Sequence, residues 1–218
     1  MDIYMSGKQP NRVQLKRNRR PLSFFRHPAE YVASRLLGDL LVRATPRGLM
    51  AGRIVETEAY PGGDDDASHT FAHKKTNRTR VLYEPGGRIY VYLIYGIYHC
   101  FNIVCAPRGN PQGVFIRAVE PVFGIEQMKK NRPVDTITKL TSGPCRWTQS
   151  FQVGLELCGE RLDGRTCWVV RGPKRGIAVR RSPRVGVEYA VESKTRLLRF
   201  FIGGNQFVSK VSLRRTCG

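Results

Sequence analysis

The chain has 218 residues, a hydrophobic content of 41% and a formal net charge of +20, from 37 Lys and Arg against 17 Asp and Glu. This length supports one sizeable core, and the longest apolar runs, such as Val91 to Tyr98, fall well short of the roughly 20 residues of a membrane-spanning helix. We therefore expect a soluble globular protein with no transmembrane segment. Its positive field favours polyanionic partners, of which nucleic acid is the commonest.

The N-terminal 20 residues are basic and poor in apolar side chains, which predicts a disordered arm, 1–20, before a single domain, 21–218. The arm lacks the apolar core of a secretory signal. Its RNRRP motif could be a nuclear signal or could add affinity for DNA. Basic residues recur through the rest of the chain, so the charge is not that of a tail alone, although a ribosome-like or membrane-surface role stays open.

In chain order, Pro28 to Val42 has the apolar spacing of an amphipathic helix that runs towards a strand. From Ile54 the period changes to two, so Glu56, Glu58 and Tyr60 share one strand face, while Val55, Thr57 and Ala59 share the other. The aromatic segment 88–104 predicts two antiparallel strands joined near Tyr95 and Gly96. Further elements are expected as a strand over 114–121, helices over 123–132 and around 143–154, and short strands at 167–170 and 177–190.

The six cysteines stand at 100, 105, 145, 158, 167 and 217, with no CxxC pair. This spacing suggests neither a zinc site nor a disulfide framework, so we expect reduced, partly buried thiols in the cytosol or nucleus. His69 and His73 have the i, i+4 spacing of a helical metal pair, but the preceding GGDDD is typical of a loop. We therefore expect no metal.

Two features suggest a chemistry. Tyr95, at the expected hairpin tip, either packs back onto the sheet or forms a wedge that enters the minor groove of DNA. Enzymes that act on one base take it out of the stack into an aromatic pocket and supply a positioned catalytic group. The acidic strand face with Glu56 and Glu58 could supply that group.

Four blocks resemble the alkyladenine (methylpurine, or 3-methyladenine) DNA glycosylase family, in order between about Pro21 and about Val211. They are GRIVETEAYPGGDDDASH (52–69), YVYLIYGIYHCFNIV (90–104), VFIRAVEP (114–121) and LTSGPCR (140–146). The expected fold is α+β, one mixed domain with a curved, mainly antiparallel sheet, surrounding helices and a protruding β-hairpin. The implied function is base-excision repair: damaged purines are flipped out of duplex DNA and the N-glycosidic bond is hydrolysed to leave an abasic site.

The resemblance assigns the general base to Glu58, which would activate water against C1′ and stabilise the oxocarbenium-like sugar. Arg117 matches the arginine that helps to hold this glutamate and the water, and a plain ion pair of the two is an alternative. Glu56 is expected to be structural, paired with a basic side chain.

Residues that match the base pocket are Tyr60, His69, Tyr92, Asn102 and Phe115. The first three would enclose the base, whose positive charge after alkylation favours electron-rich rings. Asn102 would crowd the exocyclic amine of normal guanine. Phe115 stands where the family often has leucine, so it could narrow the pocket and change the lesion range.

Tyr95 matches the intercalating tyrosine, with Ile97 beside it. Arg78 and Arg80 could contact phosphates or could simply be exposed to solvent. No lysine stands in the matched blocks where a Schiff-base nucleophile would be expected, so a monofunctional glycosylase without cofactor is implied. Its partner would be double-stranded DNA containing damaged purines, bound by a monomer, in the cytoplasm and nucleoid of a bacterium or the nucleus of a eukaryote.

Two other functions fit part of the sequence. A divalent-metal-dependent nuclease could use Glu56, Glu58, Asp64 to Asp66 and His69 as ligands, but it leaves the tyrosine hairpin and Asn102 without a role. A non-catalytic nucleic-acid-binding module would explain the charge and would not depend on Glu58. Turn formation and solvation would account for Asp64 to Asp66 under the glycosylase hypothesis.

Overall fold

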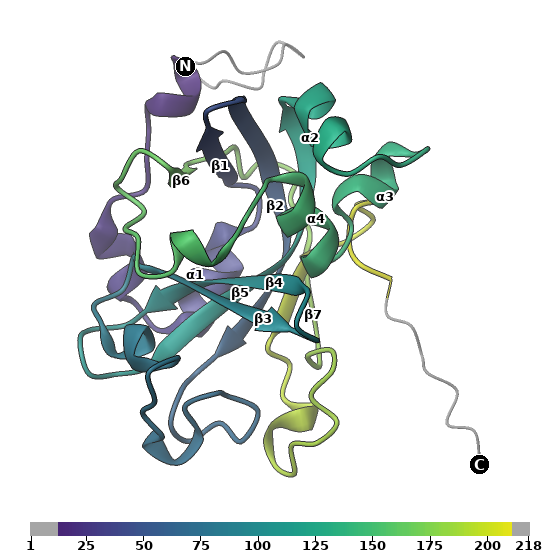
Figure 1. Ribbon diagram of the computed structural model, residues 1–218. Coiled ribbons are helices and arrows are strands. Elements are labelled where there is room, and N and C mark those ends of the chain that lie inside the picture. Colours follow the sequence, from purple (N-terminus) through teal and green to yellow (C-terminus); the bar gives the residue numbers. More distant parts are fainter. Residues whose placement is uncertain (1–12, 211–218) are drawn as a thin grey trace.

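The computed structural model describes residues 13–210, which form an eight-stranded sheet flanked by four α-helices (Figure 1). The strands are β1 (Leu40–Thr45), β2 (Gly48–Tyr60), β3 (Ile89–Ile94), β4 (Tyr98–Cys105), β5 (Gln112–Phe123), β6 (Cys167–Val170), β7 (Val179–Ser182) and β8 (Arg199–Ile202). The helices are α1 (Ala29–Leu36), α2 (Ile125–Asn131), α3 (Ile137–Thr141) and α4 (Pro144–Ser150). The predicted α+β fold with a mainly antiparallel sheet is therefore confirmed.

Strand β2 lies at the centre of the sheet, whose order is β3-β4-β5-β2-β1-β6. The first half of β2 pairs with β1, and residues Glu56 to Glu58 in its second half pair with β8, while β5 runs along its other edge. Strand β7 extends the sheet beyond β8. Both glutamates of β2 thus have a strand on each side, which explains why neither is exposed.

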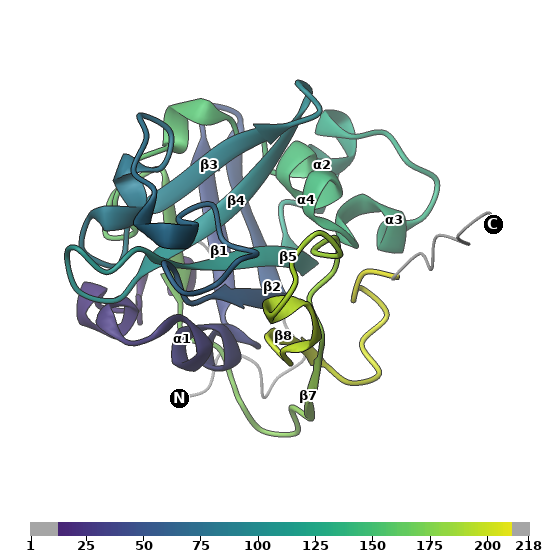
Figure 2. The ribbon, with the colours of Figure 1, turned by 90° about the horizontal axis from the view of Figure 1, so that it is seen from below.

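The helices cover the sheet at separate places. Helix α1 packs against β2 and β5, whereas α2, α3 and α4 form a group in which α4 packs against β4 and β5 (Figure 2). Helix α1 buries Val32 and Leu36, as the apolar spacing predicted, but it is shorter than expected: it ends at Leu36, and Leu40 begins β1. In α4, Trp147 is fully buried, and its Nε1 donates to the Ile116 carbonyl at 2.9 Å. The α4 helix is thereby fixed against β5, and Thr148 of α4 joins it to the start of β4 by donating to His99 O at 2.9 Å.

The β3-β4 hairpin turns at the expected place and projects from the molecule (Figure 2). Tyr95 and Gly96 both have positive φ, 54° and 72°, and Ile97 N donates to Ile94 O at 3.3 Å. Tyr95 is 79% exposed and Ile97 67%. The side chains at the tip therefore extend into solvent and do not pack back onto the sheet.

Part of the basic arm contacts the domain in this structure. Leu15 is buried, its carbonyl accepts a hydrogen bond from Trp168 Nε1 at 2.6 Å, and Arg20 pairs with Asp39 at 2.7 Å. Residues 1–12 lie outside the described part, and the domain boundary at residue 20 stays a prediction. No helix within residues 13–210 is long and apolar enough to cross a membrane.

Candidate active site

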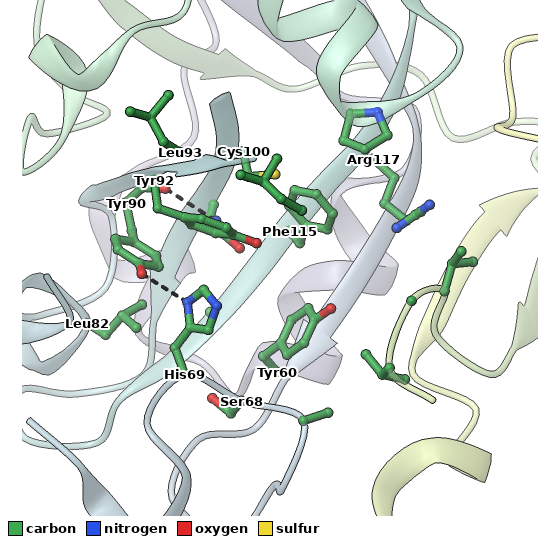
Figure 3. A pocket seen from close by; sticks show the side chains of 18 of the residues that line it. Tyr60, Ser68, His69, Leu82, Tyr90, Tyr92, Leu93, Cys100, Phe115 and Arg117 are labelled. Atoms are coloured by element: carbon green, nitrogen blue, oxygen red, sulfur yellow. Dashed lines mark hydrogen bonds between the residues drawn. The ribbon is translucent and has the colours of Figure 1, made fainter. Parts of the chain in front are cut away.

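A cavity of about 470 Å³ opens beside β2, β3, β4 and β5, a volume within the roughly 300–1,000 Å³ usual for ligand sites (Figure 3). The loop after β2, the start of α4 and the segment 185–189 complete its wall. The predicted site residues in this wall are Tyr60, His69, Arg78, Tyr92, Tyr95, Asn102, Phe115 and Arg117. Three other predicted residues, Glu58, Ile97 and Arg80, are not part of the lining.

One side of the cavity is aromatic (Figure 3). The rings of His69 and Tyr92 meet edge to face at 4.6 Å, and Tyr90 lies 5.4 Å from Tyr92. His69 Nδ1 is 2.9 Å from the Tyr90 hydroxyl. Burial, aided by the charge of Arg78, lowers the pKa of His69 to about 4, so the imidazole is neutral at pH 7. The wall is therefore a neutral aromatic surface on which a flat cationic ring can stack.

Glu58 is fully buried one layer behind the wall. Its Oε2 accepts a hydrogen bond from the Tyr60 hydroxyl at 3.0 Å, and its Oε1 accepts one from Val185 N at 2.8 Å. Arg117 Nη1 lies 3.3 Å from the same Oε1. Three cavity-lining residues thus hold the carboxylate, and each of them comes from a different segment of the chain.

Arg117 is positioned by a second carboxylate, that of Glu56. Glu56 accepts hydrogen bonds from Arg117 Nε at 3.0 Å and from Arg199 Nε at 2.7 Å. It also accepts hydrogen bonds from the backbone N and the Oγ of Ser209. Burial alone would lower the pKa of Arg117, but the charges of Glu58 and Glu56 raise it above its ordinary value. Glu56 therefore has the basic partners expected of a structural carboxylate and fixes the cation that faces Glu58.

The acidic run after β2 has a structural role that the sequence interpretation missed. Asp65 is fully buried and makes a bidentate pair with Arg184, of which one bond is 2.7 Å long. Asp66 accepts hydrogen bonds from the backbone N–H groups of residues 191, 192 and 193. These bonds, above all the one from Glu192, lower the pKa of Asp66 to about 2. The expectation that these aspartates only form a turn and face solvent is therefore met by Asp64, whose side chain is exposed, but not by Asp65 and Asp66.

Arg184 links this loop to the carboxylate site. Its guanidinium carbon lies 4.6 Å from the centroid of the Tyr60 ring, and its Nη1 donates to Ala59 O at 3.1 Å. The next residue is Val185, whose N–H binds Glu58. No local pattern could have identified Arg184, because its partner is 119 residues away. The one signal was general: a buried aspartate needs a cation.

Asn102 and Phe115 face each other across β4 and β5 on the floor of the cavity. Asn102 is nearly buried, and its Nδ2 donates to Tyr90 O at 3.3 Å. Arg78 reaches the rim, with its guanidinium carbon 5.9 Å from the Tyr92 ring centroid. Arg80 is exposed and does not reach the lining. The phosphate contacts expected for the two arginines stay predictions.

The residues of a metal site do not come together in the described part of the chain, where no group of three His, Cys, Asp or Glu side chains could hold an ion. Glu56, Glu58 and Asp65 each face an arginine instead. The five described cysteines are free thiols, as their spacing suggested.

These features define a basic α+β protein in which an aromatic pocket, a shielded carboxylate and an exposed aromatic hairpin lie close together. The chain belongs to the methylpurine-DNA glycosylase family, whose sequence model matches residues 23–206. A protein of Bacillus cereus strain G9842, named "Putative 3-methyladenine DNA glycosylase", is 42% identical over 201 residues, covering 87% of this chain and 98% of its own length. A protein of the same name from Natranaerobius thermophilus is 40% identical over 190 residues, covering 85% and 96%.

Proposed function

We propose that this protein is a monofunctional DNA glycosylase that flips alkylated or otherwise damaged purines out of duplex DNA and hydrolyses their N-glycosidic bond. The observation that carries the proposal is the position of Glu58, held directly behind an aromatic cavity by Tyr60, Arg117 and Val185. Family membership and the names of the relatives support the same activity. The proposed partner is double-stranded DNA containing a damaged purine, bound by a monomer.

The cavity suits a flat base that carries positive charge. Purines alkylated at N3 or N7 are cations, and the faces of Tyr60 and Tyr92 attract a cation through the ring quadrupole. A charged imidazole at His69 would repel such a base, and its lowered pKa of about 4 removes that repulsion at pH 7. The same positive charge weakens the glycosidic bond, so the bases that stack best are also the easiest to release.

Glu58 would act as the general base towards water. A carboxylate has roughly four acceptor positions, and three protein donors surround Glu58, which leaves it the capacity to accept a proton from water. The water oxygen bonds to C1′, its proton passes to Glu58, and the electrons of the broken C1′–N bond leave with the base. Arg117, whose Nη1 lies 3.3 Å from Oε1, orients the glutamate before the reaction.

A lyase step would require an amine that attacks C1′. None of the residues that line the cavity in the described part of the chain is a lysine. This supports a product that is an intact strand with an abasic site. The hairpin tip supports base flipping, because the exposed Tyr95 also lines the mouth of the cavity and can fill the gap that the base leaves.

The test is Glu58→Gln, which keeps the size of the side chain and removes its basicity. We expect release of 3-methyladenine or 7-methylguanine from a duplex with a single lesion to fall at least 10³-fold, while affinity for that duplex stays within about threefold. Reactions should contain EDTA, and the strand should stay uncut until the abasic site is cleaved by alkali. Activity that needs added magnesium, or that survives in the variant, would contradict the proposal.

A further inference from the structure

Two cysteines line the wall of the cavity, where the glycosylase reaction gives them no role. Cys100 lies on β4 and is 3% exposed, and Cys145 lies in the first turn of α4 and is partly exposed. Both line the cavity. The two elements are joined next to them, because Thr148 Oγ1 donates to His99 O at 2.9 Å. The pair is thus held together on packed elements and is open to small molecules from the cavity.

The hydrogen bond between Cys100 and Cys145 lowers the pKa of Cys145 and raises that of Cys100, and the charge of Arg117 also favours a thiolate at Cys145. Burial raises the pKa of Cys167 to about 12 and that of Cys105 further. A larger fraction of Cys145 is therefore ionised at pH 7 than the few per cent of an ordinary cysteine with pKa about 8.5.

We propose that Cys100 and Cys145 form a peroxide-reactive dithiol, a covalent modification site in the wall of the base pocket. The Cys145 thiolate attacks one oxygen of a peroxide ROOH, which forms a sulfenic acid and releases ROH after protonation. The Cys100 sulfur then attacks this sulfenic sulfur, an S–S bond forms, and the hydroxyl leaves as water. The peroxide is reduced and the two thiols are oxidised by two electrons in total.

The disulfide would reach the base pocket through Tyr92. The Tyr92 hydroxyl donates a hydrogen bond to the Cys100 sulfur. The two residues are a cross-strand pair of β3 and β4. Oxidation ties this strand pair to α4, so the part of the wall that carries the Tyr92 ring stiffens. We therefore expect the oxidised protein to bind a flipped base poorly and to recover on reduction.

The experiment treats the full chain with hydrogen peroxide at pH 7, then blocks free thiols and measures intact mass and non-reduced peptides. We expect a loss of 2 Da and one peptide that joins Cys100 to Cys145, formed at a rate that rises with pH as Cys145 ionises. Cys158→Ser removes an exposed thiol outside the cavity lining and should leave this product unchanged. Cys145→Ser should abolish it, and Cys100→Ser should accumulate oxygen adducts on Cys145 instead.

Release of damaged base is measured on the same samples, with and without dithiothreitol. We expect at least a tenfold loss on oxidation that dithiothreitol reverses in the wild type and in Cys158→Ser. The proposal is overturned if Cys158 is oxidised before the pair, if no Cys100–Cys145 peptide forms, or if the disulfide forms without lowering activity. A protein that forms the disulfide but never releases base would refute the proposed function and leave the dithiol established.

Discussion

The buried pair of Asp65 and Arg184 gives the sharpest prediction, because it connects an acidic loop to the carboxylate site. Both side chains are fully buried, and Arg184 also contacts the Tyr60 ring and precedes the residue that binds Glu58. Asp65→Asn keeps the shape of the side chain and leaves the guanidinium without a counter-charge. Removal of one partner from such a buried pair costs about 3–5 kcal/mol.

That loss is a large part of the roughly 5–15 kcal/mol that stabilises a typical domain. We expect urea denaturation of Asp65→Asn to show a free energy of unfolding lower by about 3 kcal/mol or more. Below the transition, base release should fall as well, because the 185–189 wall loses its anchor. The matched control is Asp64→Asn, one residue earlier in the same loop, whose exposed side chain should leave both measurements unchanged.

A variant in which both Asp65 and Arg184 are replaced distinguishes the effect of an unpaired buried charge from the effect of lost packing. Asp65→Asn combined with Arg184→Met removes the unpaired charge, and such double replacements of buried pairs are often neutral in stability. We therefore expect the double variant to regain most of the lost stability but not the activity, because Arg184 no longer holds Ala59 and Tyr60. Equal effects of Asp64→Asn and Asp65→Asn, or full activity in the double variant, would refute this reasoning.

Three further predictions follow from the site. Tyr95→Ser should weaken binding to abasic-site duplex about tenfold and binding to unmodified duplex much less, measured by fluorescence anisotropy, and equal losses would show a simple surface contact. Because burial lowers the pKa of His69 to about 4, the unfolded chain takes up a proton at this residue more readily than the folded one, and the free energy of unfolding should fall by about 3 kcal/mol as pH drops from 6.5 towards 4. His69→Asn should remove that part of the pH dependence. Phe115→Leu should raise the rate for bulky ethenoadenine relative to 7-methylguanine about tenfold, and an unchanged ratio would mean that this ring does not limit the pocket.

Elements with a strong period were predictable from the sequence. The alternation from Ile54 to Tyr60 identified β2, and the aromatic run with Gly96 identified the hairpin and its turn. Strand β8 was not predicted, because four residues, RFFI, carry no period of their own and pair only when the chain returns to β2. Short strands are decided by their neighbours in the sheet more than by their own residues.

The site was predictable as a set of residues but not as an arrangement. Tyr60, His69 and Tyr92 line one cavity, and their contact with a flipped base stays a prediction. The burial of Glu58 behind Tyr60 was not visible in the sequence, since it depends on the return of residue 185 from 127 positions away. The partners of Asp65 and Asp66 were missed for the same reason. Contacts at such separations leave no local pattern.

The outer edge of β7 affects how the protein behaves at high concentration. Within the described residues this strand pairs only with β8, so its other edge presents free backbone groups, next to the exposed Val179. Such an edge is a template for the strand of a second molecule. Arg180 and Arg181 stand on this edge and are exposed, and two edges that both carry them repel each other. Positive charge on this edge thus opposes the addition of a strand from a second copy of the chain.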